Sequence, residues 1–277
     1  MKINKQQGFT LIEIAIVFVI IAVLLSYTFM PMRAQLETAN IKNARAKLVE
    51  IEEALYGYAI ANNRLPCPTT PGGSGISNPE DPAANCANNA AIGGFIGFVP
   101  SNTLGIKGDV NCDGLLVDPW GRPYRYSIVN TDGGETPGDG DGSADFVVTG
   151  GIRSQAVSTG NPVLTGPTAV RPNIVVCNNL EVNCTNAVAS TTTAVAVIYA
   201  MGTKQRANSA TENQNAGEGG TVASTCGLPA YPVASNTLYY SAKRKEVAGS
   251  EFDDILIWIS PNILYSKLLQ AGHTLQQ

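Results

Sequence analysis

The residues best suited to chemistry are carboxylates gathered in one glycine-rich loop. Asp139, Asp141 and Asp145 are separated by glycine and other small residues, and Asp132 lies shortly before them. Calcium takes about six to eight oxygen ligands, and such a loop can wrap around it. We therefore expect a calcium site at these four aspartates. The structural alternative is a solvated acidic turn.

A second acidic stretch, residues 109–114, reads like the start of an EF-hand loop. The twelfth position of that loop would be Trp120, where calcium binding requires a bidentate carboxylate. The residues between, Leu115, Leu116 and Val117, fit a strand better. A turn followed by a strand therefore explains this stretch better than a metal site does.

The chain has six cysteines and no Cys-x-x-Cys pair: Cys67, Cys86, Cys112, Cys177, Cys184 and Cys226. An even number of cysteines without the spacing of a zinc site indicates disulfides and an oxidising compartment. Cys67–Cys86 and Cys177–Cys184 are favoured as local loops, which leaves Cys112–Cys226. Other pairings, and buried free thiols, stay open at this point.

The sequence does not identify an active site. The single histidine, His273, follows the last predicted helix. The sequence therefore does not predict a catalytic site in which a histidine activates a serine or cysteine nucleophile. Asp253 and Asp254 are adjacent on a predicted strand, so their side chains point to opposite faces and cannot form a close acid pair. The net charge of -4 argues against general binding to nucleic-acid phosphates. We expect a protein that is not an enzyme.

One further carboxylate lies in an apolar setting. Residues 9–32 are almost wholly apolar, and Glu13 is the only charged residue among them. At about 1.5 Å per residue, this run can span a hydrocarbon core of about 30 Å. A secretory signal would be shorter and followed by a small-residue cleavage site. A plain anchor leaves Glu13 unexplained, because an unpaired charge in the membrane costs about 3 kcal/mol.

The segment from Gly8 to Glu13, G-F-T-L-I-E after a leader with two lysines, resembles the signal of type IV pilins and type II secretion pseudopilins. The resemblance implies cleavage after Gly8 by a prepilin peptidase and N-methylation of Phe9. It also implies that Glu13 neutralises the new amine of a neighbouring subunit during assembly. The expected partners are other pilin or pseudopilin subunits, the peptidase, an inner-membrane assembly platform and the membrane itself.

Two segments of the head extend this resemblance. Residues 118–126, D-P-W-G-R-P-Y-R-Y, are similar to a turn and strand of the major pseudopilin, and the acidic loop with Asp139 is similar to its calcium loop. Trp120 is expected to pack into the core. Residues 150–277 are additional to the small pseudopilin head, and the chain looks like a group of larger prepilin-type proteins. A bulky head favours a minor or tip subunit.

These residues must be positioned by a long helix and a head. Residues 1–8 form the cleaved leader, and residues 9–62 the helix, transmembrane over 9–32 and amphipathic over 33–62. Apolar residues spaced three and four apart predict one buried face of its second part: Ile41, Ala44, Leu48, Ile51, Leu55 and Tyr58. Pro31 predicts a break or bend.

Residues 63–277 are expected to form a loop-rich, disulfide-tied antiparallel β head, which makes the fold α+β and type IV pilin-like. Strands are predicted at 124–129, 146–149, 174–176, 194–199, 238–240 and 255–259, and a last helix at 261–271. The expected location is the inner membrane, single-pass with a periplasmic head, and then a filament. The alternative is a membrane-anchored module that binds an envelope surface or carbohydrate.

Overall fold

The structure is a computed structural model of the 277-residue chain. It describes residues 10–78, 86, 95–129, 146–147, 152, 174–178, 184, 189–203, 214–215, 221–232, 238–245 and 252–273. Side chains of residues 26–33 and 232 are outside this description. The chain divides into two compact units, Met1–Asn43 and Ala44–Gln277.

Helix α1 extends over 52 residues, Leu11–Asn62, and contributes to both units. It continues through position 31, so the predicted break at Pro31 is wrong. A proline inside a helix removes one backbone donor and crowds the preceding turn, so it can kink a helix without ending it. Among the described residues, no helix combines the length and the apolar character needed to cross a membrane. The span at residues 9–32 stays a prediction.

The helix ends where the sequence indicates. The backbone N–H of Asn63 donates to the carbonyl of Ala59 over 2.8 Å, and Asn63 has a φ of 52°. Asparagine tolerates this left-handed conformation better than most residues do, so it closes the last turn. The chain then leaves the helix through Pro66.

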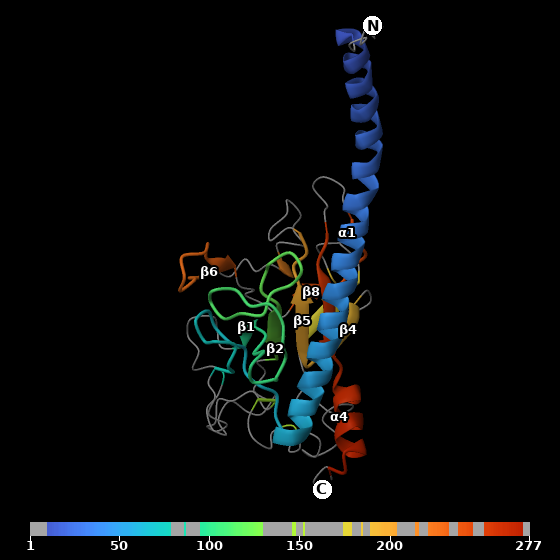
Figure 1. Ribbon diagram of the computed structural model, residues 1–277. Helices are drawn as coiled ribbons and strands as arrows, with labels where there is room; N and C mark the ends of the chain where they lie inside the picture. Colours follow the sequence, from blue (N-terminus) through green and yellow to red (C-terminus); the bar gives the residue numbers. More distant parts are fainter. Residues whose placement is uncertain are drawn as a thin grey trace, which may run out of the picture. The chain divides into compact units, whose positions relative to one another are not determined.

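The second unit contains a four-stranded antiparallel sheet in the order β1-β2-β5-β9 (Figure 1). Its strands are β1 Ile96–Phe98, β2 Arg125–Ile128, β5 Ala196–Ala200 and β9 Ile255–Ile259. In the register, Tyr126 lies opposite Ile198, which in turn lies opposite Ile257. The two central strands are buried along their whole length. β5 accordingly is a continuous apolar and aromatic run, whereas β2 buries the polar residues Arg125 and Ser127.

Two smaller sheets complete the head. One has the order β4-β3-β8, formed by β4 Ala189–Ala194, β3 Ile174–Cys177 and β8 Leu238–Tyr240. Within it, β3 pairs antiparallel with β4 and parallel with β8. The other is the hairpin-like pair of β6 Thr221–Val222 and β7 Tyr231–Pro232. The sequence predicted an antiparallel head. The parallel pairing of β3 with β8 shows that this prediction is wrong for one pair of strands.

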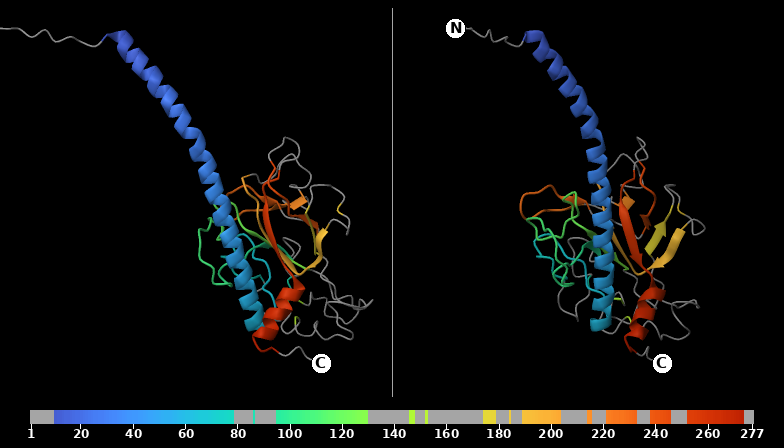
Figure 2. Two further views of the ribbon diagram at one scale, coloured as in Figure 1. Left: turned by 90° about the vertical axis from the view of Figure 1, so that its right-hand side faces the viewer. Right: turned by 45° about the vertical axis from the view of Figure 1, so that its right-hand side comes forward.

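The last part of α1 packs within the second unit beside helix α4, Pro261–Gln270 (Figure 2). Leu48, Ile51 and Leu55 are fully buried in the main core, each contributing roughly 2 kcal/mol of hydrophobic stabilisation. Lys267 of α4 contacts the Glu53 carboxylate at 2.8 Å and lies 4.6 Å from the centre of the Tyr56 ring. The predicted buried face is confirmed at these leucine and isoleucine positions.

The observed strands match the predicted ones in part. β8 and β9 have the predicted bounds, and β2, β3 and β5 differ by one or two residues at their ends. Phe146 and Val147 form a turn rather than a strand, although both are buried. β1, β4, β6 and β7 were not predicted. They are short, or rich in threonine and glycine, and their pairing depends on distant residues.

Candidate functional site

At the start of α1, Thr10 and Glu13 form a capping box. The backbone N–H and the hydroxyl of Thr10 each donate to Oε2 of Glu13 over 2.9 Å. The Glu13 N–H in turn approaches the Thr10 hydroxyl at 3.4 Å. Glu13 therefore has partners within its own chain, which the sequence analysis missed although the Thr-x-x-Glu spacing signals this motif.

The residues around Glu13 present a continuous apolar surface. Large apolar side chains between Leu11 and Leu25 are 44% to 89% exposed. Contiguous exposed apolar surface on this scale marks a site that another molecule or a membrane covers. Glu13 is the carboxylate set into that surface. Gly8 and Phe9, the predicted processing residues, lie outside the described residues.

The predicted calcium ligands Asp132, Asp139, Asp141 and Asp145 also lie outside the described residues. The EF-hand look-alike at residues 109–114 is described, and it is a structural turn. Oδ1 of Asn111 accepts the backbone N–H groups of Asp113 and Leu115 at 3.1 and 3.0 Å. Asp113 is buried and bonded to protein donors, so its carboxylate is turned away from any cation in solvent.

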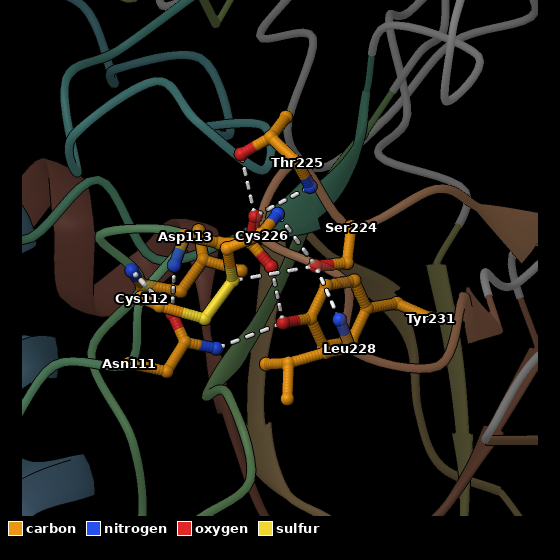
Figure 3. Close-up of a disulfide and its surroundings, with 9 residues drawn as sticks. Asn111, Cys112, Asp113, Ser224, Thr225, Cys226, Leu228 and Tyr231 are labelled. Atoms are coloured by element: carbon orange, nitrogen blue, oxygen red, sulfur yellow. Dashed lines mark hydrogen bonds between the residues drawn. A yellow bond between two sulfur atoms is a disulfide. The ribbon is translucent and has the colours of Figure 1, made fainter.

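The Asp113 carboxylate joins two loops that are distant in the sequence (Figure 3). Its Oδ1 accepts the N–H and the hydroxyl of Thr225 over 2.7 Å, and its Oδ2 accepts the Tyr231 hydroxyl over 2.6 Å. Burial alone would raise the pKa of Asp113, but hydrogen bonds from Tyr231, Thr225 and Ser224 outweigh it and lower the pKa to about 2. Asp113 is therefore ionised at neutral pH.

The three disulfides of the structure are Cys67–Cys86, Cys112–Cys226 and Cys177–Cys184. They are the three pairs that the sequence analysis favoured. Cys67 and Cys86 are fully buried in the main core. The Cys112–Cys226 bridge has both residues exposed and joins positions 114 apart in the sequence.

The turn at residues 118–122 is held by one carboxylate. Oδ1 of Asp118 accepts the backbone N–H groups of Trp120 and Arg122, both over 2.9 Å, and Gly121 has a φ of 80°. Burial raises the pKa of Asp118 to about 6, although the hydrogen bonds from Arg122 and Trp120 lower it. Trp120 packs partly buried against the main core, as predicted.

A buried polar cluster, which the sequence analysis missed, lies under the sheet. Asn215 is fully buried, donates to Oδ2 of Asp254 over 2.8 Å and exchanges hydrogen bonds with the backbone of Tyr240. Arg125 is buried with its guanidinium carbon 4.4 Å from the centre of the Phe98 ring. Burial raises the pKa of Asp254 to about 8, although Asn215 and Arg125 lower it. This cluster stabilises one arrangement of the core.

Asp253 and Asp254 lie just before β9, so the prediction that they lie on a strand is wrong, and they bind different partners. Oδ2 of Asp253 accepts the Thr203 N–H over 2.7 Å, whereas Asp254 binds Asn215. Among the described residues, the one grouping of potential metal ligands is Cys112, Asp113 and Cys226. Its two sulfurs are joined in the disulfide, so they are not free to bind a metal.

Comparison with known proteins agrees with the N-terminal site. Residues 3–29 match the family described as the prokaryotic N-terminal methylation motif. The chain is 31% identical to type II secretion system core protein G of Aeromonas hydrophila, over 45% of this chain and 75% of that protein. It is also 31% identical to the protein of the same name from Vibrio cholerae, over 45% of this chain and 73% of that protein. The Escherichia coli protein is 31% identical as well, over 44% of this chain and 71% of that protein. No solved structure matches the chain.

A methylation motif followed by an apolar helix and an α+β head defines a prepilin-type protein. Within this class, the chain belongs to the family of type II secretion system core protein G, a pseudopilin family. Its role is therefore structural. The alignments leave more than half of the chain unmatched, so this protein has extensive sequence beyond the part shared with those relatives.

Proposed function

We propose that this chain is a processed filament subunit of the cell envelope. In this proposal a prepilin peptidase cuts after Gly8 and Phe9 is N-methylated. The apolar part of α1 lies in the inner membrane as a single pass, with the head in the periplasm. An assembly platform then transfers the chain into a filament with other pilin or pseudopilin subunits. The observation that carries the proposal is Glu13, a carboxylate within the exposed apolar surface of α1.

The chemistry of assembly follows from that carboxylate. Cleavage creates an ammonium group at Phe9, and methylation preserves its charge. A charge buried in a helical bundle is strongly destabilising unless it is paired. Glu13 supplies the opposite charge, four positions along the helix and about 6 Å along its axis. Pairing with the amine of a neighbouring subunit removes both unpaired charges at once.

We further propose that the subunit is a minor or tip component of the filament. The head contains three disulfides and two small sheets besides the four-stranded one. A larger head restricts the number of neighbours that can pack in successive turns. The part of the chain without a counterpart in the aligned relatives supports this assignment. The type IV pilus and the type II secretion filament are the two machines to which it applies.

Mass spectrometry of the protein purified from cell envelopes tests the processing. We expect a mature chain that begins at Phe9 and carries one methyl group on its amine. A Gly8→Ala variant should accumulate with its leader attached, whereas Ser266→Ala, a change on the exposed face of α4, should be processed normally. A native chain that retains its first eight residues would favour a membrane-anchored binding module and contradict the proposal.

We also propose that Asp132, Asp139, Asp141 and Asp145 hold calcium when the ion is present. Full-length protein in detergent, titrated with calcium in a calorimeter, should release or absorb heat with a dissociation constant in the range of extracellular sites, about 0.1 to 1 mM. The double variant Asp139→Asn, Asp141→Asn should lose this signal, and Asp109→Asn should keep it. The absence of heat from the unaltered protein at millimolar calcium would refute this site.

A further inference from the structure

We propose that the Cys112–Cys226 disulfide is a site of reversible thiol–disulfide exchange with a dithiol, and that it controls how the turn between β6 and β7 is held. We call the disulfide, Asp113, Ser224 and Tyr231 the surface clamp. The clamp lies entirely in the second unit, so this proposal does not depend on the filament role. It is carried by the exposure of the two cysteine residues, the hydrogen bonds around them and the segments that they join.

Accessibility distinguishes this disulfide from the other two. Thiol–disulfide exchange requires a thiolate to reach a sulfur atom. Cys67 and Cys86 are both 0% exposed within the main core, and Cys177 is also 0% exposed. By contrast, Cys112 and Cys226 are both exposed, and residues 225–230 beside them are exposed as well. An external dithiol therefore meets the clamp first.

The clamp can survive the loss of its covalent bond. Asp113 receives three hydrogen bonds from Thr225 and Tyr231, the residues on either side of the turn. Tyr231 also packs in a small buried cluster with Phe98 and Leu115, its ring centre 5.3 Å from that of Phe98. These contacts hold the two loops together without the disulfide. The reduced cysteines stay near each other, so oxidation can restore the same pair.

Ser224 lies at the clamp without favouring either sulfur (Figure 3). Its hydroxyl lies 3.5 Å from the sulfur of Cys226, but its single proton goes to the Asp113 carboxylate, whose pKa it helps to lower. The backbone N–H groups of Cys226 and Leu228 donate to the same hydroxyl oxygen, both over 3.1 Å, which fixes its position.

The electrostatics act on both sulfurs alike. The ionised Asp113 has a carboxylate oxygen within 4.8 Å of both sulfurs and disfavours negative charge on either one.

The exchange is balanced in two steps. A thiolate of the dithiol attacks one sulfur of the clamp, forms a mixed disulfide with that cysteine and releases the other cysteine as a thiolate, which then takes up a proton. The second thiol of the dithiol attacks the mixed disulfide and releases the first cysteine. The dithiol is oxidised to a disulfide while the clamp is reduced to two thiols. The exposed turn at residues 226–230 then loses its covalent tether to the loop at residues 109–113.

The test uses the oxidised full-length protein in detergent with limiting dithiothreitol, followed by alkylation and mass spectrometry. We expect Cys112 and Cys226 to be labelled at least tenfold faster than the other four cysteines. After removal of the reductant, the same pair should re-form without denaturant. Equal labelling of all three pairs, slower labelling of the clamp, or re-formation of other pairs would overturn the proposal.

A trapping experiment tests the site of attack. A thioredoxin-like protein that lacks its second active-site cysteine should form a mixed disulfide with Cys112 or Cys226 and with none of the other four cysteines. The Ser266→Ala variant should give the same result. Trapping at Cys67, Cys86, Cys177 or Cys184 would refute the proposal.

Discussion

Replacing Glu13 with valine is expected to leave the chain in the membrane and to reduce its incorporation into filaments at least tenfold. Valine removes the carboxylate and keeps the apolar surface of α1, so insertion does not suffer. In the proposed filament, the methylated amine of Phe9 then has no opposite charge, and an unpaired buried charge costs several kcal/mol. Cell fractionation measures membrane insertion, and sheared or cross-linked filaments measure incorporation.

The capping box supplies the matched control for this experiment. Thr10→Ala removes the hydroxyl bonded to Glu13 and weakens the start of α1 by about 1 kcal/mol, but it keeps the carboxylate. If assembly depends on charge, Thr10→Ala chains enter filaments close to normally while Glu13→Val chains do not. Equal defects in both variants would assign the effect to the helix start. Normal assembly of Glu13→Val would refute the role of Glu13.

Asp254→Asn is expected to make the head more stable than the unaltered protein at pH 9. Burial raises the pKa of Asp254 from 3.8 to about 8 in the folded state. Folding therefore favours the protonated form of Asp254. The stability that this form contributes is fully present below pH 3.8 and is lost as the pH rises through about 8. Each unit of that shift corresponds to about 1.4 kcal/mol. The free energy of unfolding should fall by about 2 kcal/mol from pH 6 to pH 8.

The pH range is chosen to separate Asp254 from its neighbours. Burial raises the pKa of Asp118 to about 6, so Asp118 adds to the slope chiefly below pH 6. Asn215 and Arg125 face Asp254 and do not change charge in this interval. Denaturant unfolding at pH 6, 7, 8 and 9 should give a flatter profile for Asp254→Asn. The control variant Asp109→Asn changes an exposed carboxylate and should show the same pH dependence of unfolding as the unaltered protein. The same pH dependence in all three proteins would contradict the prediction.

The helices were the most predictable part of the fold because their signals are local. Leu48, Ile51 and Leu55 recur at helical spacing and are buried. Ser260 and Pro261 mark the start of α4, and Gly272 follows its end with a φ of 85°. The parallel pairing of β3 with β8 could not be predicted, since it joins Val176 to Tyr239 across a long stretch of chain. Such non-local pairing leaves no periodic pattern in either strand alone.

The residues of the candidate site also differ in how well the sequence predicts them. Glu13 was found because it is the only charge in a long apolar run. Thr10 was missed because its importance depends on the direction of the Glu13 side chain. The cluster of Arg125, Asn215 and Asp254 was missed for a different reason. Its members come from three separate segments, and nothing in their immediate sequence separates a buried charge from an exposed one.

The order of the strands has a consequence for how the head is made. β9 pairs with β5 along all five residues of each strand, and α4 follows it directly and contacts α1 through Lys267. β9 thus covers one edge of β5, and α4 links β9 to the last turns of α1. Without β9, the unpaired backbone groups of β5 would form an open edge that can pair with strands of other chains. β9 therefore protects the four-stranded sheet against edge-to-edge aggregation.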